Sequence, residues 1–182
     1  MESGHKFDAM LFNSSQDGDL DGVMQALAGG GRVSMRTSKG FTPLLVAAGY
    51  GHTDICGLLL AYGSNVNEVK PGEKHTALHL AAGKGHQATV EALLTWGAAV
   101  DHQDHVGFTP LLGACEEGHL ACVLTLLKAG ANFSLSSNDG NFPIHAAAQK
   151  NRVEIVKTLL EHGCSLNMVS CTCSEITLSK IS

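Results

Sequence analysis

The chain has 182 residues, of which 44% are hydrophobic and 16% charged, so its composition is that of a folded protein. The net charge of −5 and the presence of only 12 Lys and Arg residues exclude a general polyanion binder, because nucleic-acid affinity comes largely from basic side chains. No apolar run approaches the roughly 20 residues that span a bilayer, and the first ten residues lack the apolar core of a secretory signal. We therefore expect an intracellular protein, in the cytoplasm, the nucleus or both, with no direct nucleic-acid contact and no membrane span.

The N-terminal part predicts a short helical unit. Residues 1–6 are expected to be disordered, and the segments 7–16 and 21–27 are predicted to be helices. The first of these lacks the Thr-Pro start that marks later helices. We interpret residues 7–37 as a degenerate capping unit, whose outer side meets solvent.

A repeated pattern follows and is clearest in residues 75–100, HTALHLAAGKGHQATVEALLTWGAAV. Thr76 can accept a hydrogen bond from a free backbone N–H and so cap a helix over residues 77–82. A second helix follows with an apolar stripe on one side, and Gly97 ends it with positive φ. Neither helix can bury its apolar side alone, so the unit needs stacked neighbours.

Three landmarks recur with a period of 33 or 34 residues. Thr42, Thr76, Thr109 and Phe142 mark the cap, Gly51-His52, Gly85-His86 and Gly118-His119 mark the turn between helices, and Gly63, Gly97, Gly130 and Gly163 mark the second stop. The period predicts four repeats, at residues 38–69, 70–103, 104–136 and 137–169. One extra residue is expected at the Pro71-Gly72 turn.

The segments FTPLLVAAGYGH, HTALHLAAGKGH, FTPLLGACEEGH and NFPIHAAAQKNR share this period and a first helix close to T-P-L-H-x-A. Over residues 7–169 the chain resembles the ankyrin repeat family. The resemblance implies an all-α solenoid of helix-turn-helix units joined by β-hairpin loops. It also implies that His79 and His145 tie the helix start to the preceding loop, a bond that Leu45 and Leu112 replace with apolar contact.

Repeat four departs from the pattern at the cap of its first helix and at both residues of the Gly-His turn. Phe142 stands at the cap, Asn151 at the turn glycine and Arg152 at the following histidine. Asn adopts the left-handed conformation more readily than most residues, so we expect it at Asn151. We also expect repeat four to be less stable than repeats two and three.

The tail, residues 170–182, does not fit a fifth repeat and is expected to be irregular. We favour a truncated form of a longer array over a tail that folds back with Ile176, Leu178 and Ile181 on the last repeat. Cys171 and Cys173 are interpreted as incidental exposed thiols rather than as zinc ligands or disulfide partners.

Ten histidines raise the question of a metal site. Repeat geometry accounts for five of them, and the remaining cluster of His75, His102 and His105 lies at loop tips with no helix to hold the ligands together, so we expect no metal. Cys115 and His119 are spaced like a thiol and its base, but the repeat places the cysteine in the core. Cys56, Cys115, Cys122 and Cys164 are all predicted to be small buried residues. We expect no catalytic set and no cofactor.

The positions that the repeat leaves free form the candidate binding surface. In ankyrin proteins a concave surface is built from residues just before the cap, from the end of the first helix and from the residue before the second glycine. The candidate partner-binding residues are Phe41, Tyr50, Tyr62, His75, Lys84, Trp96, His105, Phe108, Glu116, Glu117, Asp139, Asn141 and Lys150. Lys39, Glu73, Gln149 and His162 occupy equivalent positions. Tyr50, Tyr62 and Trp96 are expected to anchor the partner, whereas Phe41 and Phe108 fit packing between repeats equally well.

These features predict a non-catalytic module for protein–protein interaction, a scaffold or adaptor that binds an extended segment or helix of its partner and acts as a monomer. Glu116 and Glu117 favour a basic partner group near repeat three. The alternatives are a stand-alone inhibitor of a kinase or other enzyme, which the small ankyrin inhibitors of cyclin-dependent kinases resemble in size, or the recognition part of a larger adaptor such as a ubiquitin-ligase receptor. A metal-dependent enzyme is the hypothesis from a different class. The resemblance also implies Asn67 as a substrate of an asparaginyl hydroxylase.

Overall fold

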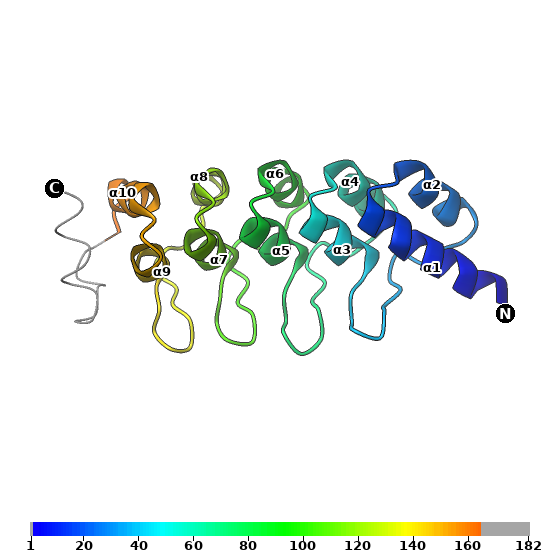
Figure 1. Ribbon diagram of the computed structural model, residues 1–182, viewed down its shortest axis with the longest axis horizontal. Helices are drawn as coiled ribbons and strands as arrows, with labels where there is room; N and C mark the ends of the chain where they lie inside the picture. The colour runs from blue at the N-terminus through cyan, green and yellow to red at the C-terminus, as the bar shows by residue number, and fades with distance from the viewer. Residues whose placement is uncertain (1, 165–182) are drawn as a thin grey trace.

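The computed structural model describes residues 2–164, which form ten α-helices in two stacked rows (Figure 1). The inner row contains α1 (Glu2–Asp17), α3 (Pro43–Tyr50), α5 (Ala77–Lys84), α7 (Pro110–Glu117) and α9 (Pro143–Gln149). The outer row contains α2 (Leu20–Ala28), α4 (Thr53–Ala61), α6 (Gln87–Thr95), α8 (Leu120–Lys128) and α10 (Val153–Glu161). Loops project from the inner row, and no β-strand occurs within residues 2–164. The architecture is the predicted all-α solenoid.

The N-terminal unit differs from the expected one at its start. Helix α1 begins at Glu2, so residues 2–6 are helical where disorder was expected. The helix has 16 residues and packs against both α2 and α3. Buried Asp8 accepts hydrogen bonds from the backbone N–H and the Nε–H of Arg32, at 2.8 and 3.0 Å. These bonds join α1 to the loop that follows α2, which gives the helix partners along more of its length than the repeat pattern implied.

The predicted helix starts and stops are present in the first three repeats. Thr42, Thr76 and Thr109 accept a hydrogen bond from the backbone N–H three residues later, at 3.3, 3.4 and 3.2 Å. Gly51, Gly85 and Gly118 follow their helices with φ of 79°, 78° and 93°. A side chain would strain the backbone at these φ values, which is why glycine recurs at the turn.

The core runs between the two rows along the whole stack. Its largest fully buried side chains include leucines that recur at equivalent positions, namely Leu44, Leu78 and Leu111 in the inner helices and Leu59, Leu93, Leu126 and Leu159 in the outer helices. Cys56, Cys115, Cys122 and Cys164 are free and buried, as predicted. Burial raises the pKa of Cys56 to about 12 and that of Cys122 to about 11. These thiols therefore stay protonated and act as small apolar side chains.

Each loop between repeats turns back on itself through backbone hydrogen bonds. Thr37 bonds to Phe41, Asp104 to Phe108 and Ser137 to Asn141, in each case from the first N–H to the last C=O. In repeat two the corresponding bond joins Lys70 to His75 and encloses one residue more, as the Pro71-Gly72 turn predicted. The added residue places Lys74 at φ 58°, where the other loops have glycine.

Three histidines, which we call the ladder histidines, tie the outer helices α4, α6 and α8 to the preceding repeat. The Nε2 atoms of His52, His86 and His119 lie 3.0, 3.1 and 3.2 Å from the carbonyl oxygens of Gln16, Gly49 and Gly83. Since a carbonyl only accepts, each Nε2–H donates to the end of an inner helix, where backbone oxygens lack partners within the helix. The period identified these histidines as turn markers, but it did not show that they bond to another repeat.

Repeat four reaches the same fold with different residues. Phe142 provides no side-chain cap, and α9 has seven residues where the three preceding inner helices have eight. Asn151 has φ 58°, which confirms the expected left-handed conformation. Arg152 replaces the ladder histidine and donates from Nε to the Glu116 carbonyl at 3.4 Å. The predictions for residues 170–182, Cys171 and Cys173 included, concern residues outside the described part of the chain.

Candidate protein-binding surface

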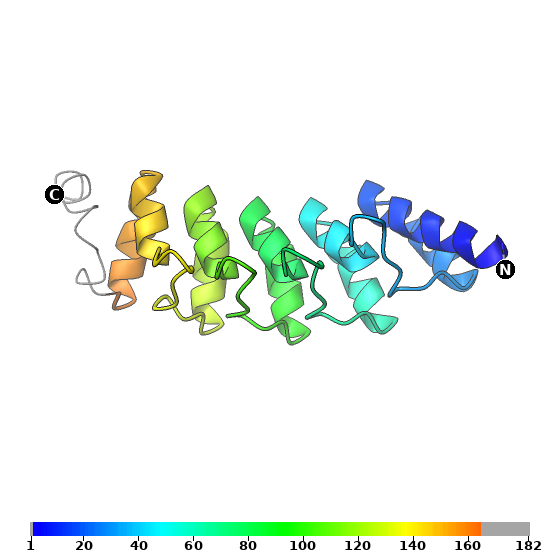
Figure 2. The same ribbon diagram turned by 90° about the horizontal axis from the view of Figure 1, so that it is seen from below.

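The loop tips and the exposed sides of α3, α5, α7 and α9 form one continuous side of the stack, which we call the inner face (Figures 1 and 2). Each repeat contributes to it the residue before the cap and the last residues of the inner helix. The residues before the cap are Phe41, His75, Phe108 and Asn141, and those near the helix ends are Tyr50, Lys84, Glu117 and Lys150. The inner face thus contains most of the candidate residues.

A groove of about 800 Å³ lies on the inner face between α1, the 37–41 loop, α3 and α5. Its apolar lining comes from Phe12, Phe41, Leu45, Val46, Tyr50 and Leu80. Lys39 and Lys84 also line it. The sequence indicated Phe41, Tyr50 and Lys84 but not the other apolar residues. Phe12 lies in the N-terminal capping unit, which lacks the repeat pattern. Val46 and Leu80 are aliphatic residues of the kind expected in the core. Their place four residues after the cap threonine was the signal that could have identified them.

Tyr62 and Trp96 lie apart from this groove. They follow the last residues of α4 and α6 in the outer row, and their side chains are 59% and 49% exposed. Because α3 and α4 are joined by a two-residue turn, they run in opposite directions, and Tyr50 and Tyr62 stand at opposite ends of the pair. At about 1.5 Å per residue, α4 separates these ends by roughly 13 Å. The structure therefore does not bring Tyr50, Tyr62 and Trp96 together into one cluster.

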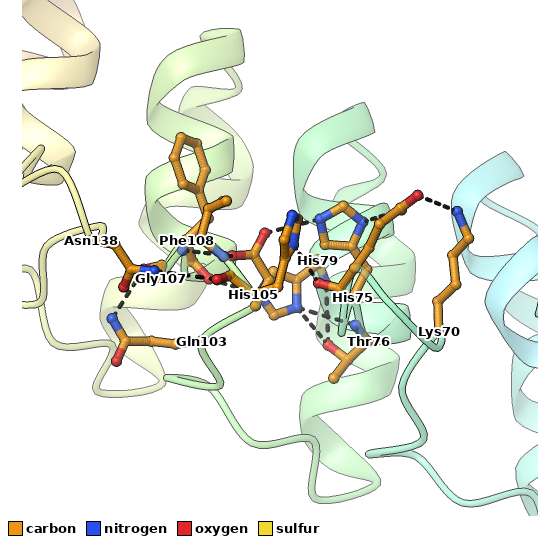
Figure 3. A network of polar contacts seen from close by, with 12 residues as sticks. Lys70, His75, Thr76, His79, Gln103, His105, Gly107, Phe108 and Asn138 are labelled. Atoms are coloured by element: carbon orange, nitrogen blue, oxygen red, sulfur yellow. Dashed lines mark hydrogen bonds and ion pairs between the residues drawn. The ribbon is translucent and has the colours of Figure 1, made fainter.

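A polar network joins the loops of repeats two and three (Figure 3). His75 lies between two carboxylates, with Nδ1 at 3.2 Å from Glu73 and Nε2 at 3.0 Å from Asp104. Glu73 also accepts from Lys70 at 2.6 Å, and this bond lowers the pKa of the Glu73 carboxyl. Asp104 is buried and accepts from the backbone N–H groups of Val106 and Phe108. Both ring nitrogens of His75 thus have partners within the array.

His105 and Phe108 are also used to hold the loops together. The His105 ring lies 2.9 Å from the Glu73 carbonyl oxygen, and Asn138 donates to the His105 carbonyl at 3.2 Å. The Phe108 carbonyl lies 3.1 Å from Nε2 of His79. Each contact crosses from one repeat to the next. These two candidates thus have a structural role in the loops, in addition to any contact with a partner.

His79 differs from the expectation for its bonds. Its Nδ1 accepts from the Thr76 backbone N–H at 3.3 Å, while Nε2 reaches the Phe108 carbonyl of the following repeat. The ring therefore joins its own helix start to the next loop, and the expected tie to the preceding loop is wrong. Burial lowers the pKa of His79 to about 4, which fits a neutral ring with one donor and one acceptor.

Four histidine rings gather at this junction. His75 lies 5.7 Å from His79 and 6.5 Å from His105, and His79 lies 5.8 Å from His102, measured between ring centroids. The ring nitrogens of His79 are already bonded to Thr76 and Phe108. Among residues 6–164, no three His, Cys, Asp or Glu side chains are placed to hold a metal ion together.

A family model of ankyrin repeats in three copies matches residues 11–104 and 90–170, which together make up most of the chain. This chain is an ankyrin repeat protein. Ankyrin repeats generally serve as protein–protein interaction modules and generally have no catalytic activity. A search of curated proteins found no match. None of the helices within residues 2–164 combines the length and apolar character needed to cross a membrane.

In this ankyrin array only one residue of the acidic pair Glu116-Glu117 takes part in an ion pair within the described part of the chain. Glu116 forms an ion pair with Lys150 of repeat four at 3.4 Å, whereas Glu117 is exposed and forms no ion pair with the side chains of residues 6–164. Asp139 is exposed at the tip of the last loop, and Asn141 donates its backbone N–H to Ser137. The negative charge available to a partner here comes from Glu117 and Asp139 rather than from a Glu116-Glu117 pair.

Asn67 lies in an exposed loop between ankyrin repeats one and two. Its amide oxygen accepts from the backbone N–H of Ala99 at 2.7 Å, and its amide nitrogen donates to the Gly97 carbonyl at 3.3 Å. Asp101, one period later, accepts from the Asn132 backbone N–H at 2.9 Å. The side chains of Asn67 and Asp101 therefore each form hydrogen bonds to the following repeat.

Proposed function

We propose that this ankyrin array is a scaffold or adaptor that binds an extended segment or helix of a partner protein on its inner face. The observation that carries the proposal is the 57% exposure of Tyr50 beside the apolar lining of the groove. A large aromatic side chain left exposed beside further apolar side chains is typical of binding surfaces. The groove gives such a partner a defined place to bury side chains without any change in the fold.

Tyr62 and Trp96 supply a second contact edge in this proposal. Helices α4 and α6 each lead into a loop of the inner face, so a partner that extends from these loops to the ends of the two helices would contact both side chains. Among the described residues, the exposed large apolar side chains outside these contacts are Leu20, Met24 and Val106. The aromatic members of the exposed set thus all belong to the candidate surface.

The test is capture of partners from a cell lysate with Tyr50→Ser, with Tyr62→Ser/Trp96→Ala, and with Met24→Ser as a matched control on the outer row. Circular dichroism first establishes equal helicity for all variants. We expect the first two variants to lose a partner that the wild type and the Met24→Ser control retain. Equal capture by all four proteins would refute binding through these aromatic residues.

We also propose Asn67 as a site of asparagine hydroxylation, which its exposure in a loop supports. The test is the mass of the peptide that contains Asn67, taken from protein isolated from cells. Addition of one oxygen atom to that peptide, absent in an Asn67→Ala variant, is the expected result. An unmodified peptide after co-expression with an asparaginyl hydroxylase would overturn it.

A further inference from the structure

The groove owes its position to the side chains of two repeats. Seven residues after the cap, α3 and α5 carry Gly49 and Gly83, whereas α7 carries Glu116. At Gly49 the missing side chain leaves space within the groove, while in the third repeat Glu116 stands at the equivalent position and extends to Lys150. Gly49 is one of the groove residues, and a Cβ there would meet only Leu80, at 3.8 Å.

The apolar character of the groove is also confined to this end of the array. Four residues after the cap, the first two repeats have Val46 and Leu80, and the last two have Gly113 and Ala146. The groove is closed on the N-terminal side by Phe12 of α1. A partner side chain placed here meets aliphatic and aromatic groups on several sides, so it would have to be apolar and large.

The charge around the groove has one sign. Lys39 and Lys84 line it and are exposed, and neither takes part in an ion pair with the side chains of residues 6–164. No Asp or Glu belongs to the lining. Lys70 lies 4.5 Å over the Phe41 ring, but Glu73 balances its charge. Two unbalanced cations therefore flank an apolar groove on a chain whose net charge is −5.

We propose that this groove binds a segment of a partner protein in which large aliphatic or aromatic side chains are flanked by Asp and Glu. The apolar side chains of the segment would enter the space beside Gly49, and its carboxylates would pair with Lys39 and Lys84. Apolar burial supplies most of the affinity, and the two lysines select acidic over basic segments. This inference rests on the proposed binding function and specifies the chemistry of the partner.

The first experiment selects peptides from a random displayed library on the purified full chain. Enriched peptides are expected to combine Leu, Ile or Phe with neighbouring Asp or Glu. A fluorescein-labelled peptide of this kind is then titrated against the wild type, Lys39→Glu, Lys84→Glu and Lys128→Glu. Lys128 is exposed in the last turn of outer-row helix α8, so its reversal makes the same change in net charge away from the groove. Each groove reversal should weaken binding roughly tenfold at low salt, and the Lys128 reversal should not.

The second experiment fills the groove without harming the fold. Gly49→Leu replaces a helical glycine by a better helix former and projects its side chain toward Leu80. Gly83→Leu is the matched control, because Gly83 has the equivalent place on α5 and is not a groove residue. We expect Gly49→Leu to keep the thermal stability and lose the peptide, and Gly83→Leu to keep both.

Two results would overturn the inference. One is the enrichment of basic or purely polar peptides, or of none. The other is an acidic peptide whose affinity is unchanged by Gly49→Leu and by both lysine reversals. Either result leaves the proposed function standing if lysate capture still depends on Tyr50, Tyr62 or Trp96. Loss of that dependence, with the acidic peptide still bound in the groove, would instead refute Tyr50, Tyr62 and Trp96 as anchors and leave the groove as the binding site.

Discussion

Repeats one to three and repeat four adopt one backbone arrangement with different local support. The first three have a threonine cap, a left-handed glycine and a histidine that bonds to the preceding repeat. Repeat four has Phe142, Asn151 and Arg152 at these positions, yet Ile144 and Ala147 of α9 are buried like their equivalents. Packing against the neighbouring repeat is thus sufficient to form the helix pair, and the local signals add stability to it.

These local features can be ordered by the loss of unfolding free energy that we expect when each is removed. Substitution of a left-handed glycine in close contact with a histidine ring is expected to cost the most. The contribution of the partly buried His79 depends on its protonation state. A cap or a ladder bond contributes less. Each feature can be removed by substitution from a repeat that has it or introduced into repeat four.

The largest effect is expected for Gly85→Ala, which should lower the free energy of unfolding by about 3 kcal/mol. Gly85 has φ 78°, and a Cβ there would lie 2.6 Å from Nδ1 of His119. Strain in the backbone and collision with the ladder histidine act together. Urea unfolding monitored by circular dichroism measures the loss.

Gly97→Ala separates the two causes. Gly97 has φ 82°, but a Cβ there would meet nothing within 4 Å. It should therefore show the backbone strain alone, about 1 to 2 kcal/mol. Equal losses for both substitutions would show that the contact with His119 has no energetic weight.

The second effect concerns pH and the histidine of repeat two. The folded-state pKa of His79 is about 4, below the unfolded value of about 6.5. Between these values the unfolded chain binds a proton that the folded chain does not, so stability falls as the pH is lowered from 6.5 toward 4 and this contribution levels off below that. At roughly 1.4 kcal/mol per pKa unit, the loss from pH 7 to pH 4.5 should be about 2 kcal/mol.

His79→Leu is the control for this dependence, because Leu45 and Leu112 occupy the same position in repeats one and three and are buried. The variant loses the bonds to Thr76 and Phe108 and should be less stable at pH 7. Its unfolding free energy should depend less on pH than that of the wild type between pH 6.5 and 4. Parallel pH profiles would exclude His79 as the source of the dependence.

The third effect tests the cap. Thr109→Val keeps the shape of a side chain that is 1% exposed but removes the hydroxyl that accepts from the Leu112 backbone N–H. Repeat three then lacks a cap, as repeat four does, and we expect a loss of about 1 kcal/mol in urea unfolding. Thr95→Val on the exposed side of α6 makes the same chemical change without a cap and should cost less than about 0.5 kcal/mol.

The fold followed from the sequence because its determinants are local and periodic. Thr76, Gly85 and Gly97 each fix a helix end through their own chemistry, and the period repeats the result. The ties between repeats could not be predicted in the same way. The bond from His86 to Gly49 joins residues 37 positions apart, and the length of α1 depends on contacts outside the pattern.

The candidate surface was predicted less completely than the fold. A periodic alignment assigns Tyr50 and Tyr62 to the same repeat, but it contains no information on which end of an antiparallel helix pair each one occupies. It also cannot show that His75 lies between Glu73 and Asp104, since Asp104 belongs to the next repeat. Side-chain neighbours across repeats depend on the stacking geometry, and the groove is a product of that geometry.

The smallest effect is expected for Arg152→His, which introduces the ladder residue of the first three repeats into repeat four. Arg152 donates to the Glu116 carbonyl at 3.4 Å, longer than the 3.0 to 3.2 Å of the three histidine bonds. A histidine at this position should shorten the bond and raise the free energy of unfolding by about 0.5 kcal/mol. Arg152→Ala removes the donor and should lower it by a similar amount. If His and Ala at position 152 have the same effect in urea unfolding, the ladder bond contributes nothing at this junction, and the histidines of the earlier repeats are retained for the packing of their rings against Gly18, Gly51 and Gly85.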